Sequence, residues 1–512
     1  MKYFQNKYSC ILNSAGILMF LIIINSAIYA QNHSNAGDQN NSISLLEERI
    51  RAYLVAINSG SHERILNFTR EHSDSTFLKQ LPMHIIISIH MGEYYKSGGL
   101  GYDLHEIRSS EKNGLVAVVH NRLTDAWLNL RIPVSPSPPH KIMMFAEFEP
   151  IPPPSGFEQR KRIGDQEIVK RLQICLDRMV KDDEFSGAVL FALNGVPLFK
   201  KAYGLADKSH DVPNRLDTRF NTASLGKMFT GVAVAQLFEK GKLLPNDPLS
   251  KFVPVDWLQS EVSRTIQIQN LLTHTSGLGD YFKKLYDQPT PQVYRGLEDY
   301  RPLVVDQIPA FDPGTRWSYS NTGFLLLGVV IEDVSKEDYF DYLRNHIYKP
   351  AGMTNTDAYD KDSPVLNAAT GYMKEYTGSG MQWRSNIITR VMKGGPSGGS
   401  MSTVEDLLKF DIALRNHKLL NPKYTEIVLS SKPEINSPFY GYGFFIDQSA
   451  AGRIAGHGGD GTGISSQFKM YLDLNYSVIV LSNYNVPAAS IVEEVIHQMI
   501  LSNYMPKSKI EE

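Results

Sequence analysis

Asn221-Thr222-Ala223-Ser224-Leu225-Gly226-Lys227-Met228-Phe229 contains a Ser-x-x-Lys pattern at the expected start of a helix. Apolar residues then recur roughly along one helical face, at Leu225, Met228, Phe229, Val232, Leu237 and Phe238. In the first turn of a helix the backbone N–H groups are unpaired and the dipole is positive, which suits a nucleophilic serine. Lys227 lies on the same face as Ser224, so we expect a desolvated Lys227 to accept the proton of Ser224.

The bulk composition is that of an ordinary globular protein. The chain has 512 residues, 42% of them hydrophobic and 21% charged, which suits two domains. A net charge of -2 leaves no basic excess to neutralise phosphates, so nucleic acid is not expected as a partner. The sequence contains no zinc-type Cys/His cluster, no phosphate-binding Gly-x-x-x-x-Gly-Lys-Ser/Thr and no dinucleotide fingerprint. We therefore expect neither a metal nor a cofactor.

Residues 1–30 are predicted to be a secretory signal peptide. Lys2 and Lys7 give a positive start, an apolar run covers 15–24, and small residues before Ala30 offer a cleavage site. The alternative is a retained membrane anchor, because the uncharged part of this segment is long enough to span a bilayer. No other run approaches that length. We expect a secreted or periplasmic protein with no integral membrane domain apart from this segment.

Residues 31–149 are predicted to form a small α+β module of unknown role. Helical patterns extend from about residue 44 to 95, and alternating apolar residues then predict strands over 115–120, 128–134 and 142–148. Helices followed by antiparallel strands are typical of α+β folds, and the module resembles the cone-shaped nuclear-transport-factor-2-like folds. Its histidines form no recognisable metal-site motif, and we assign them to solvated or core positions.

A Pro-rich linker, residues 150–165, is expected to precede a second domain over 166–505 and a polar tail over 506–512. Cys175, the one cysteine of the expected mature chain, is assigned to packing. One sheet would be assembled from both ends of this domain, with a helical, loop-rich region between them. The expected elements are a helix over 166–181, strands over 187–193 and 196–203 joined by Asn194-Gly195, the Ser224 helix, strands over 442–446, 465–472 and 477–482, and a helix over 488–501.

A second motif is Tyr319-Ser320-Asn321, which neighbouring Pro-Gly and Asn-Thr-Gly clusters place on a loop before an apolar helix. A loop tyrosine is usually an amphipathic surface residue. Near a cationic lysine, however, the phenol of Tyr319 would ionise more easily and act as a base.

A third motif is His457-Gly458-Gly459-Asp460-Gly461-Thr462-Gly463, which precedes the expected strand over 465–472. One interpretation is a flexible turn with a surface histidine. The other is a strand edge whose N–H groups help to form an oxyanion hole, with His457 steering protons or a substrate anion.

Together, Ser224-x-x-Lys227, Tyr319-x-Asn321 and His457-x-Gly459 resemble the motifs of the serine β-lactamase and penicillin-binding-protein superfamily. The most similar branch is the class C-like one, which also holds D-alanyl-D-alanine carboxypeptidases, D-aminopeptidases and esterases. The resemblance covers about 166–501 and implies a β-lactamase/transpeptidase-like fold of the α+β class, an antiparallel sheet flanked by helices plus a helical region. Supporting patterns lie at 271–278, 313–314, 350–353 and 398–403.

The resemblance also implies residue roles. Ser224 would attack a carbonyl and become acylated, Lys227 would keep the network correctly protonated, and Tyr319 would exchange protons with nucleophile and leaving group. His274, in one of the supporting patterns, is expected to be structural. The remaining implied roles are an oxyanion hole made by the N–H groups of Ser224 and Asp460, and substrate binding by Asn321 and Gly459.

The third motif departs from the Lys-Thr-Gly or Lys-Ser-Gly of the β-lactamases. Histidine is charged only part of the time near neutral pH, so His457 is a weaker partner for an antibiotic carboxylate. We expect a serine hydrolase acting on a small ester or a D-amino-acid peptide or amide, possible cell-wall peptides included. The alternatives are a DD-carboxypeptidase or weak β-lactamase and, in another class, a catalytically silent sensor of peptidoglycan fragments. The loops at about 280–301 and 371–393 carry no readable specificity.

Overall fold

The computed structural model describes residues 39–81, 83–110, 114–135, 139–157, 162–288, 294–377, 380–389 and 391–504. The expected signal peptide and polar tail lie outside these residues. Within them, no helix combines the length and the apolar character that a membrane span requires. Contacts divide the chain into two compact units. Among the described residues, unit 1 consists of Ser186–Glu375 and Met381–Ala489, and unit 2 of the chain up to Phe185, the segment Tyr376–Gly380 and the chain from Ser490 onward.

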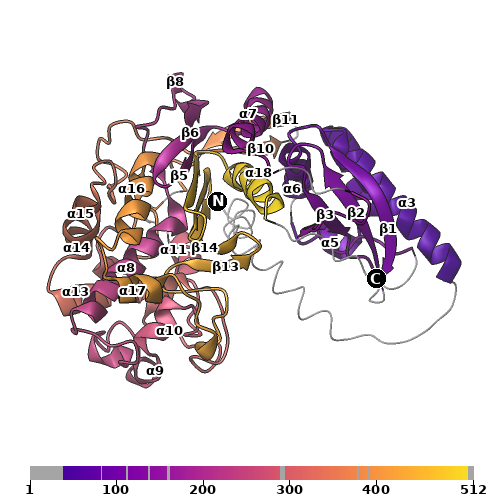
Figure 1. The fold of residues 1–512 in the computed structure, drawn as a ribbon. Coiled ribbons are helices and arrows are strands. Elements are labelled where there is room, and N and C mark those ends of the chain that lie inside the picture. Colours follow the sequence, from indigo (N-terminus) through magenta and orange to yellow (C-terminus); the bar gives the residue numbers. More distant parts are fainter. Residues whose placement is uncertain are drawn as a thin grey trace. The chain divides into compact units, whose positions relative to one another are not determined.

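A six-stranded sheet forms the centre of unit 1 (Figure 1). Its strand order is β13-β14-β15-β16-β5-β6, and every neighbouring pair is antiparallel. The sheet therefore joins strands from both ends of unit 1, as the sequence predicted. The Asn194-Gly195 hairpin turn is confirmed, since both residues have positive φ, 52° and 75°. The strands are β5 (Gly187–Leu193), β6 (Val196–Tyr203), β13 (Phe445–Ser449), β14 (Gly452–Gly461), β15 (Ile464–Tyr471) and β16 (Tyr476–Ser482).

Helix α8 (Gly226–Glu239) runs through the core of unit 1. The sequence predicted one apolar face, but every residue from Gly226 to Phe238 is buried. Gly231 explains part of this difference, because a Cβ there would lie 2.1 Å from the carbonyl oxygen of Tyr442, so neighbouring backbone approaches the helix closely. Lys227 in its first turn is consequently buried.

The rest of unit 1 is largely helical, as predicted. Helix α13 (Asn321–Ser335) packs against α8, and α16 (Val404–Arg415) packs against β5 and β16. The hairpin of β10 (Tyr372–Thr377) and β11 (Gly380–Ser385) was not predicted. The other elements are β7 (Leu205–Asp207), β8 (Val212–Pro213), β9 (Phe220–Asn221), η1 (Ala223–Leu225), η2 (Leu249–Lys251), α9 (Ser260–Thr265), α10 (Ile268–Leu272), α11 (Phe282–Tyr286), η4 (Leu297–Tyr300), α12 (Arg301–Val304), α14 (Tyr339–Leu343), η5 (Arg344–Tyr348), α15 (Lys349–Ala351), β12 (Met401–Ser402), α17 (Pro422–Val428) and η6 (Pro433–Ile435).

Unit 2 contains a four-stranded antiparallel sheet in the order β1-β2-β3-β4, accompanied by helices (Figure 1). Helices α3 and α6 pack together, and α3 also packs against β1 and β2. The small α+β module predicted for the N-terminal region is therefore confirmed. The elements are α3 (Gln39–Asn58), α4 (His62–His72), α5 (Ser75–Leu78), α6 (Met83–Lys96), β1 (Tyr102–Ser110), β2 (Gly114–Asn121), β3 (Trp127–Arg131), β4 (Glu147–Ile151), α7 (Asp165–Lys181) and all but the first two residues of α18 (Ala488–Ser502).

Helices α7 and α18 belong to unit 2 by their contacts. Arg171 of α7 donates to the carbonyl oxygen of Leu123 at 2.9 Å, and the amide of Asn121 donates to Gln498 of α18 at 3.1 Å. Cys175 is buried in α7, as the packing assignment predicted. The domain boundary within 150–165 stays a prediction.

In unit 2 one predicted strand is misplaced and one strand was not predicted. The strand expected over 142–148 is instead β4, which begins at Glu147 and extends into the Pro-rich segment. An edge strand tolerates Pro150 because one side of its backbone needs no ladder partner. Strand β1 was missed because a register shift between Leu104 and Glu106 interrupts its alternation.

Candidate active site

Ser224 lies in η1, one turn of 3-10 helix directly before α8. The turn packs against β14 and β15, so the serine faces strands that come from the far end of the sequence. Ala223 before it has a φ of +43°, a conformation that non-glycine residues adopt rarely and that clusters at functional sites. Residues 220–226 thus fold into a constrained turn that presents the Ser224 hydroxyl.

Lys227 is fully buried beneath Ser224, and its ammonium nitrogen has three partners. Nζ lies 3.1 Å from Ser224 Oγ, 2.7 Å from Asn321 Oδ1 and 2.5 Å from the carbonyl oxygen of Ser397. Burial lowers the pKa of Lys227 to about 7, although the Asp280 carboxylate opposes this shift. Near neutral pH a substantial fraction of Lys227 is therefore uncharged.

The arrangement around Nζ directs the lone pair of the neutral amine. The carbonyl oxygens of Asn321 and Ser397 can only accept hydrogen bonds, so they occupy two N–H groups of Lys227. The third tetrahedral position faces Ser224 Oγ. Neutral Lys227 can therefore accept the Ser224 proton, whereas the charged form can only donate toward it.

Tyr319 also contacts Ser224. Its hydroxyl donates to Ser224 Oγ at 2.9 Å. The loop is fixed by Ser320, which caps α13 and whose N–H donates to His274 Nδ1 at 3.0 Å. His274 is fully buried, and the centroid of its ring lies 4.2 Å from the centroid of the Tyr319 ring. Both observations agree with the structural role expected of His274.

The protonation of Tyr319 differs from the sequence-based expectation. Burial raises the pKa of Tyr319 above its ordinary value, and the hydrogen bond with Ser224 offsets only part of that shift. The expected easier ionisation near Lys227 is therefore wrong for the resting site. Desolvation of the phenol is the largest cause of this shift, and the Asp280 and Asp460 carboxylates add to it. Tyr319 is a phenol there, and thus a proton donor.

Asp280 is a site residue that the sequence reasoning missed. Its Oδ2 accepts from Asn321 Nδ2 at 3.1 Å, while its Oδ1 accepts from the N–H of Phe282 at 2.9 Å. Burial raises the pKa of Asp280, and these hydrogen bonds oppose the shift. The available signal was its position, two residues beyond the supporting pattern that ends at Leu278.

His457 lies on β14 and is 3% exposed, so the interpretation as a turn with a surface histidine is wrong. Its Nε2 lies 3.0 Å from the hydroxyl of Tyr440, and its Nδ1 lies 2.5 Å from the carbonyl oxygen of Gly458. Burial, with a further contribution from Lys227, lowers the pKa of His457 to about 3. The imidazole is therefore neutral at physiological pH, and both of its nitrogens have partners.

Gly459 and Asp460 follow on the same strand. A Cβ on Gly459 would lie 2.3 Å from the carbonyl oxygen of Thr222 and 2.9 Å from the nitrogen of Ser224. Glycine is therefore needed for β14 to approach the Ser224 turn. Burial raises the pKa of Asp460 to about 7, and its Oδ1 has no hydrogen-bond partner among the described residues.

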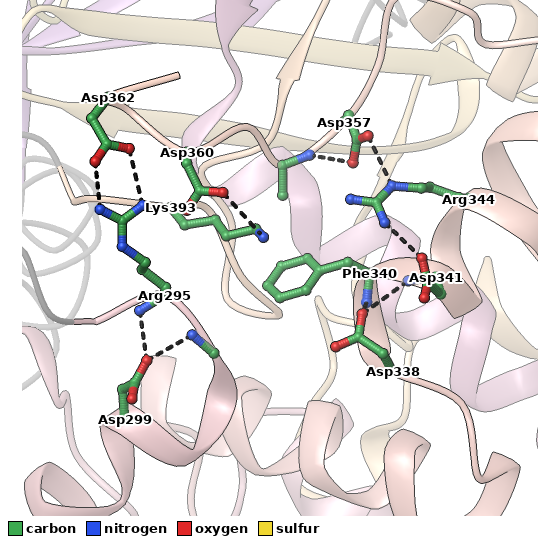
Figure 2. Close-up of polar contacts among 12 residues, drawn as sticks. Arg295, Asp299, Asp338, Phe340, Asp341, Arg344, Asp357, Asp360, Asp362 and Lys393 are labelled. Carbon is green, nitrogen blue, oxygen red and sulfur yellow. Dashed lines mark hydrogen bonds and ion pairs between the residues drawn. The ribbon is translucent and has the colours of Figure 1, made fainter. Parts of the chain in front are cut away.

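Ion pairs with Asp360 connect the loops at about 280–301 and 371–393, whose sequences carried no readable specificity (Figure 2). Arg295 of the first loop contacts Asp360 at 3.1 Å and Asp362 at 2.5 Å. Lys393 of the second lies 3.6 Å from Asp360 and 4.3 Å from the centre of the Phe340 ring. Asp360 thus joins both loops, and Lys393 precedes by four residues the Ser397 carbonyl that binds Lys227.

The chain is similar in sequence and in structure to known proteins. The chain is 31% identical over 330 residues to penicillin-binding protein 4* of Bacillus subtilis (strain 168), covering 61% of this chain and 71% of that protein. A penicillin-binding protein from Bacillus halodurans has a similar structure, with a TM-score of 0.57 and 32% identity, covering 63% of this chain and 98% of that one.

A D-stereospecific amidohydrolase from Streptomyces is also similar, with a TM-score of 0.52 and 26% identity, covering 62% of this chain and 94% of that one. The sequence model described as Beta-lactamase matches residues 173–497, which include all three motifs. On this evidence the chain belongs to the Beta-lactamase family and is a serine hydrolase with the β-lactamase/transpeptidase-like fold.

Proposed function

We propose that this protein hydrolyses small esters or D-amino-acid amides and peptides through an acyl-enzyme on Ser224. The observation that carries the proposal is the position of Ser224 Oγ, 3.1 Å from Lys227 Nζ and 2.9 Å from the Tyr319 hydroxyl. One neighbour is an amine whose pKa burial lowers to about 7, and the other is a protonated phenol. The nucleophile therefore has a proton acceptor and a proton donor in direct contact.

The reaction proceeds in two steps. Ser224 Oγ bonds to the substrate carbonyl carbon while its proton passes to neutral Lys227, and the N–H groups of Ser224 and Asp460 hold the oxyanion. Collapse breaks the bond to the leaving alcohol or amine, which takes a proton from Tyr319, and the phenolate recovers a proton from Lys227. Water then attacks the acyl-enzyme, releases the acid and returns a proton to Ser224.

The third motif supports this substrate class over β-lactam antibiotics. A β-lactamase uses a cation at this position to bind the carboxylate of the drug, whereas His457 is buried, neutral and bonded through both nitrogens. The likeness to the Streptomyces enzyme, a D-stereospecific amidohydrolase, favours D-amino-acid amides. Cell-wall peptides are the corresponding larger substrates, and the pattern at 1–30 supports a location outside the cytoplasm.

Mass spectrometry of the mature protein with a serine-directed phosphonate tests the nucleophile. We expect one adduct on the wild type, none on Ser224→Ala, and an unchanged adduct on Ser209→Ala, which alters an exposed serine of the same unit. An undiminished adduct on Ser224→Ala would refute the assignment of the nucleophile.

A substrate panel tests the activity. We expect turnover of short-chain aryl esters or D-amino-acid amides and little turnover of a chromogenic cephalosporin. Efficient turnover of the cephalosporin alone would contradict the argument from His457. Stoichiometric acylation without release of product would instead favour a sensor.

A further inference from the structure

A cavity of about 310 Å³ lies in unit 2, and none of its lining residues belongs to the Ser224 site. It is lined by residues of β1 to β4, by the turn between β2 and β3, by the segment after β4, and by the C-terminal end of α18 with the residue after it. Its volume lies at the lower end of the range for small-molecule sites, roughly 300–1,000 Å³. A small organic ligand would therefore fit it.

Aromatic rings form one wall of this cavity. The Trp127 ring is central, with ring centroids of Phe157 at 4.7 Å, His120 at 4.9 Å and His105 at 5.3 Å. His105 and Phe157 also contact each other, at 4.8 Å. Phe157 remains 46% exposed although it belongs to this cluster. Exposed aromatic surface that lines a cavity is typical of a ligand-binding site.

The charged side chains that line the cavity are acidic. They are Asp103, which is ion-paired with Arg122, and Asp125; the described lining residues include no lysine or arginine. Asp125 Oδ1 lies 2.8 Å from His120 Nε2, which places this carboxylate beside the aromatic wall. Because Arg122 is paired with Asp103, the Asp125 carboxylate carries the negative charge beside the rings, and this charge disfavours an anionic ligand.

We propose that the cavity binds an organic cation, a primary or quaternary ammonium with a small apolar body. The faces of aromatic rings attract such cations, and a carboxylate at the edge of the rings adds a charge partner. Trp127 is the best cation partner among the aromatic side chains, and Asp125 is the closest acid to it in sequence. The site is independent of the reaction at Ser224.

Calorimetric titration of the full mature chain tests the proposal, with choline and n-butylamine as probes. The neutral isostere of choline, 3,3-dimethylbutan-1-ol, has nearly the same shape without the charge. We expect saturable binding of at least one cation in the millimolar range or tighter, and at least tenfold weaker binding of the isostere. Ser224→Ala should leave this binding unchanged.

Two variants localise the site. Asp125→Asn removes the charge and keeps the shape, and Trp127→Leu removes the ring; each should weaken cation binding on the order of tenfold. Glu106→Gln is the matched control, since it removes an exposed carboxylate from the same strand as His105 without lining the cavity. Thermal unfolding of each variant checks that the unit remains folded, and Asp103→Asn provides a second charge variant should Asp125→Asn unfold.

Three results would overturn the proposal. Equal binding of choline and its isostere would assign the cavity to neutral apolar ligands. Unchanged cation binding in both charge variants and in Trp127→Leu would place the cation elsewhere. The absence of saturable binding of either cation would exclude an ammonium site here.

Discussion

Asp280 and Asn321 share a hydrogen bond of 3.1 Å that orients the amide next to the buried lysine. An ionised carboxylate only accepts hydrogen bonds, so Asn321 turns its NH₂ group to Asp280 and its oxygen to Lys227. That orientation occupies one N–H of Lys227 and leaves the third position of Nζ facing Ser224. Asp280 therefore acts on the nucleophile through two intermediate side chains.

Asp280→Ala should lower kcat/KM by on the order of tenfold, because Asn321 loses the partner that fixes its orientation. Asp280→Asn keeps an acceptor oxygen and should restore much of that rate. Both variants should move the acidic limb of the pH profile to lower pH, since the Asp280 carboxylate raises the pKa of Lys227.

Asp338→Ala is the matched control for Asp280. Each aspartate accepts a hydrogen bond from the N–H group two residues later, Asp280 from Phe282 and Asp338, the N-cap of α14, from Phe340, both at 2.9 Å. The control loses a cap without touching Asn321, so its pH profile should not move. If the acidic limb stays in place in both Asp280 variants, the carboxylate does not influence Lys227.

Lys227→Met should reduce kcat/KM by roughly 10²- to 10⁴-fold, the usual effect of losing a general base. In the wild type, kcat/KM should fall as pH drops below about 7, because protonated Lys227 cannot accept the Ser224 proton. The Lys227→Met variant should lose this acidic limb of the pH profile of kcat/KM.

Lys432→Met provides the control for Lys227. Burial also lowers the pKa of Lys432, to about 8, and its Nζ donates to backbone carbonyl oxygens rather than to a serine of the site. Loss of the Lys432 amine should affect stability but leave the acidic limb of the kcat/KM profile near pH 7 in place. A limb that persists in Lys227→Met would assign the titration to another group.

The three motif residues Ser224, Lys227 and Tyr319 were predictable as one cluster, since each lies at the start of a helix or just before one. Such local signals are encoded in a few neighbouring residues. The strand character of His457–Gly461 was harder to recognise, because glycines hide the alternation that identifies a strand. It forms a strand because β13 and β15 pair with it on both sides, a tertiary effect.

The contacts around Lys227 could not be derived from the sequence. Asp280 and the carbonyl of Ser397 lie far from Lys227 along the chain, and only the fold brings them to its ammonium and to Asn321. The pKa of Tyr319 was also beyond sequence reasoning, since its direction depends on how completely the phenol is enclosed.

Tyr319→Phe should lower kcat/KM by on the order of 100-fold while the variant remains folded. The phenylalanine keeps the ring contact with His274 and loses only the hydroxyl that donates to Ser224. Tyr424→Phe removes a hydroxyl that donates to the carbonyl oxygen of Phe238, outside the site, and should retain activity. Wild-type rates in Tyr319→Phe would show that another group protonates the leaving group.

Gly459→Ala should abolish most activity, because its Cβ would overlap the backbone of Thr222 and Ser224. Backbone cannot move aside as a flexible side chain can, so either β14 or the Ser224 turn must shift. Gly395→Ala is the control, since a Cβ there meets no atom within 4 Å. Phosphonate labelling rates of both variants measure the effect, and unimpaired labelling of Gly459→Ala would contradict the close approach of strand and serine.

His457→Gln should make the protein less sensitive to acid. The folded-state pKa of His457, about 3, lies below its ordinary value of 6.5, so between these values the unfolded chain binds more protons. The free energy of unfolding therefore falls as pH drops from 6.5 toward 3, and this group alone accounts for a loss of about 2 kcal/mol at pH 5.

Denaturant unfolding at pH 8 and pH 5 measures this effect. The difference in free energy of unfolding between the two pH values should be smaller in His457→Gln than in the wild type by about that amount. His62→Gln, which replaces an exposed histidine at the start of α4, is the control for the loss of a histidine. A His457→Gln variant with the full wild-type difference would mean that the imidazole is protonated in the folded protein, and the argument against β-lactam substrates, which rests on a neutral His457, would fail with it.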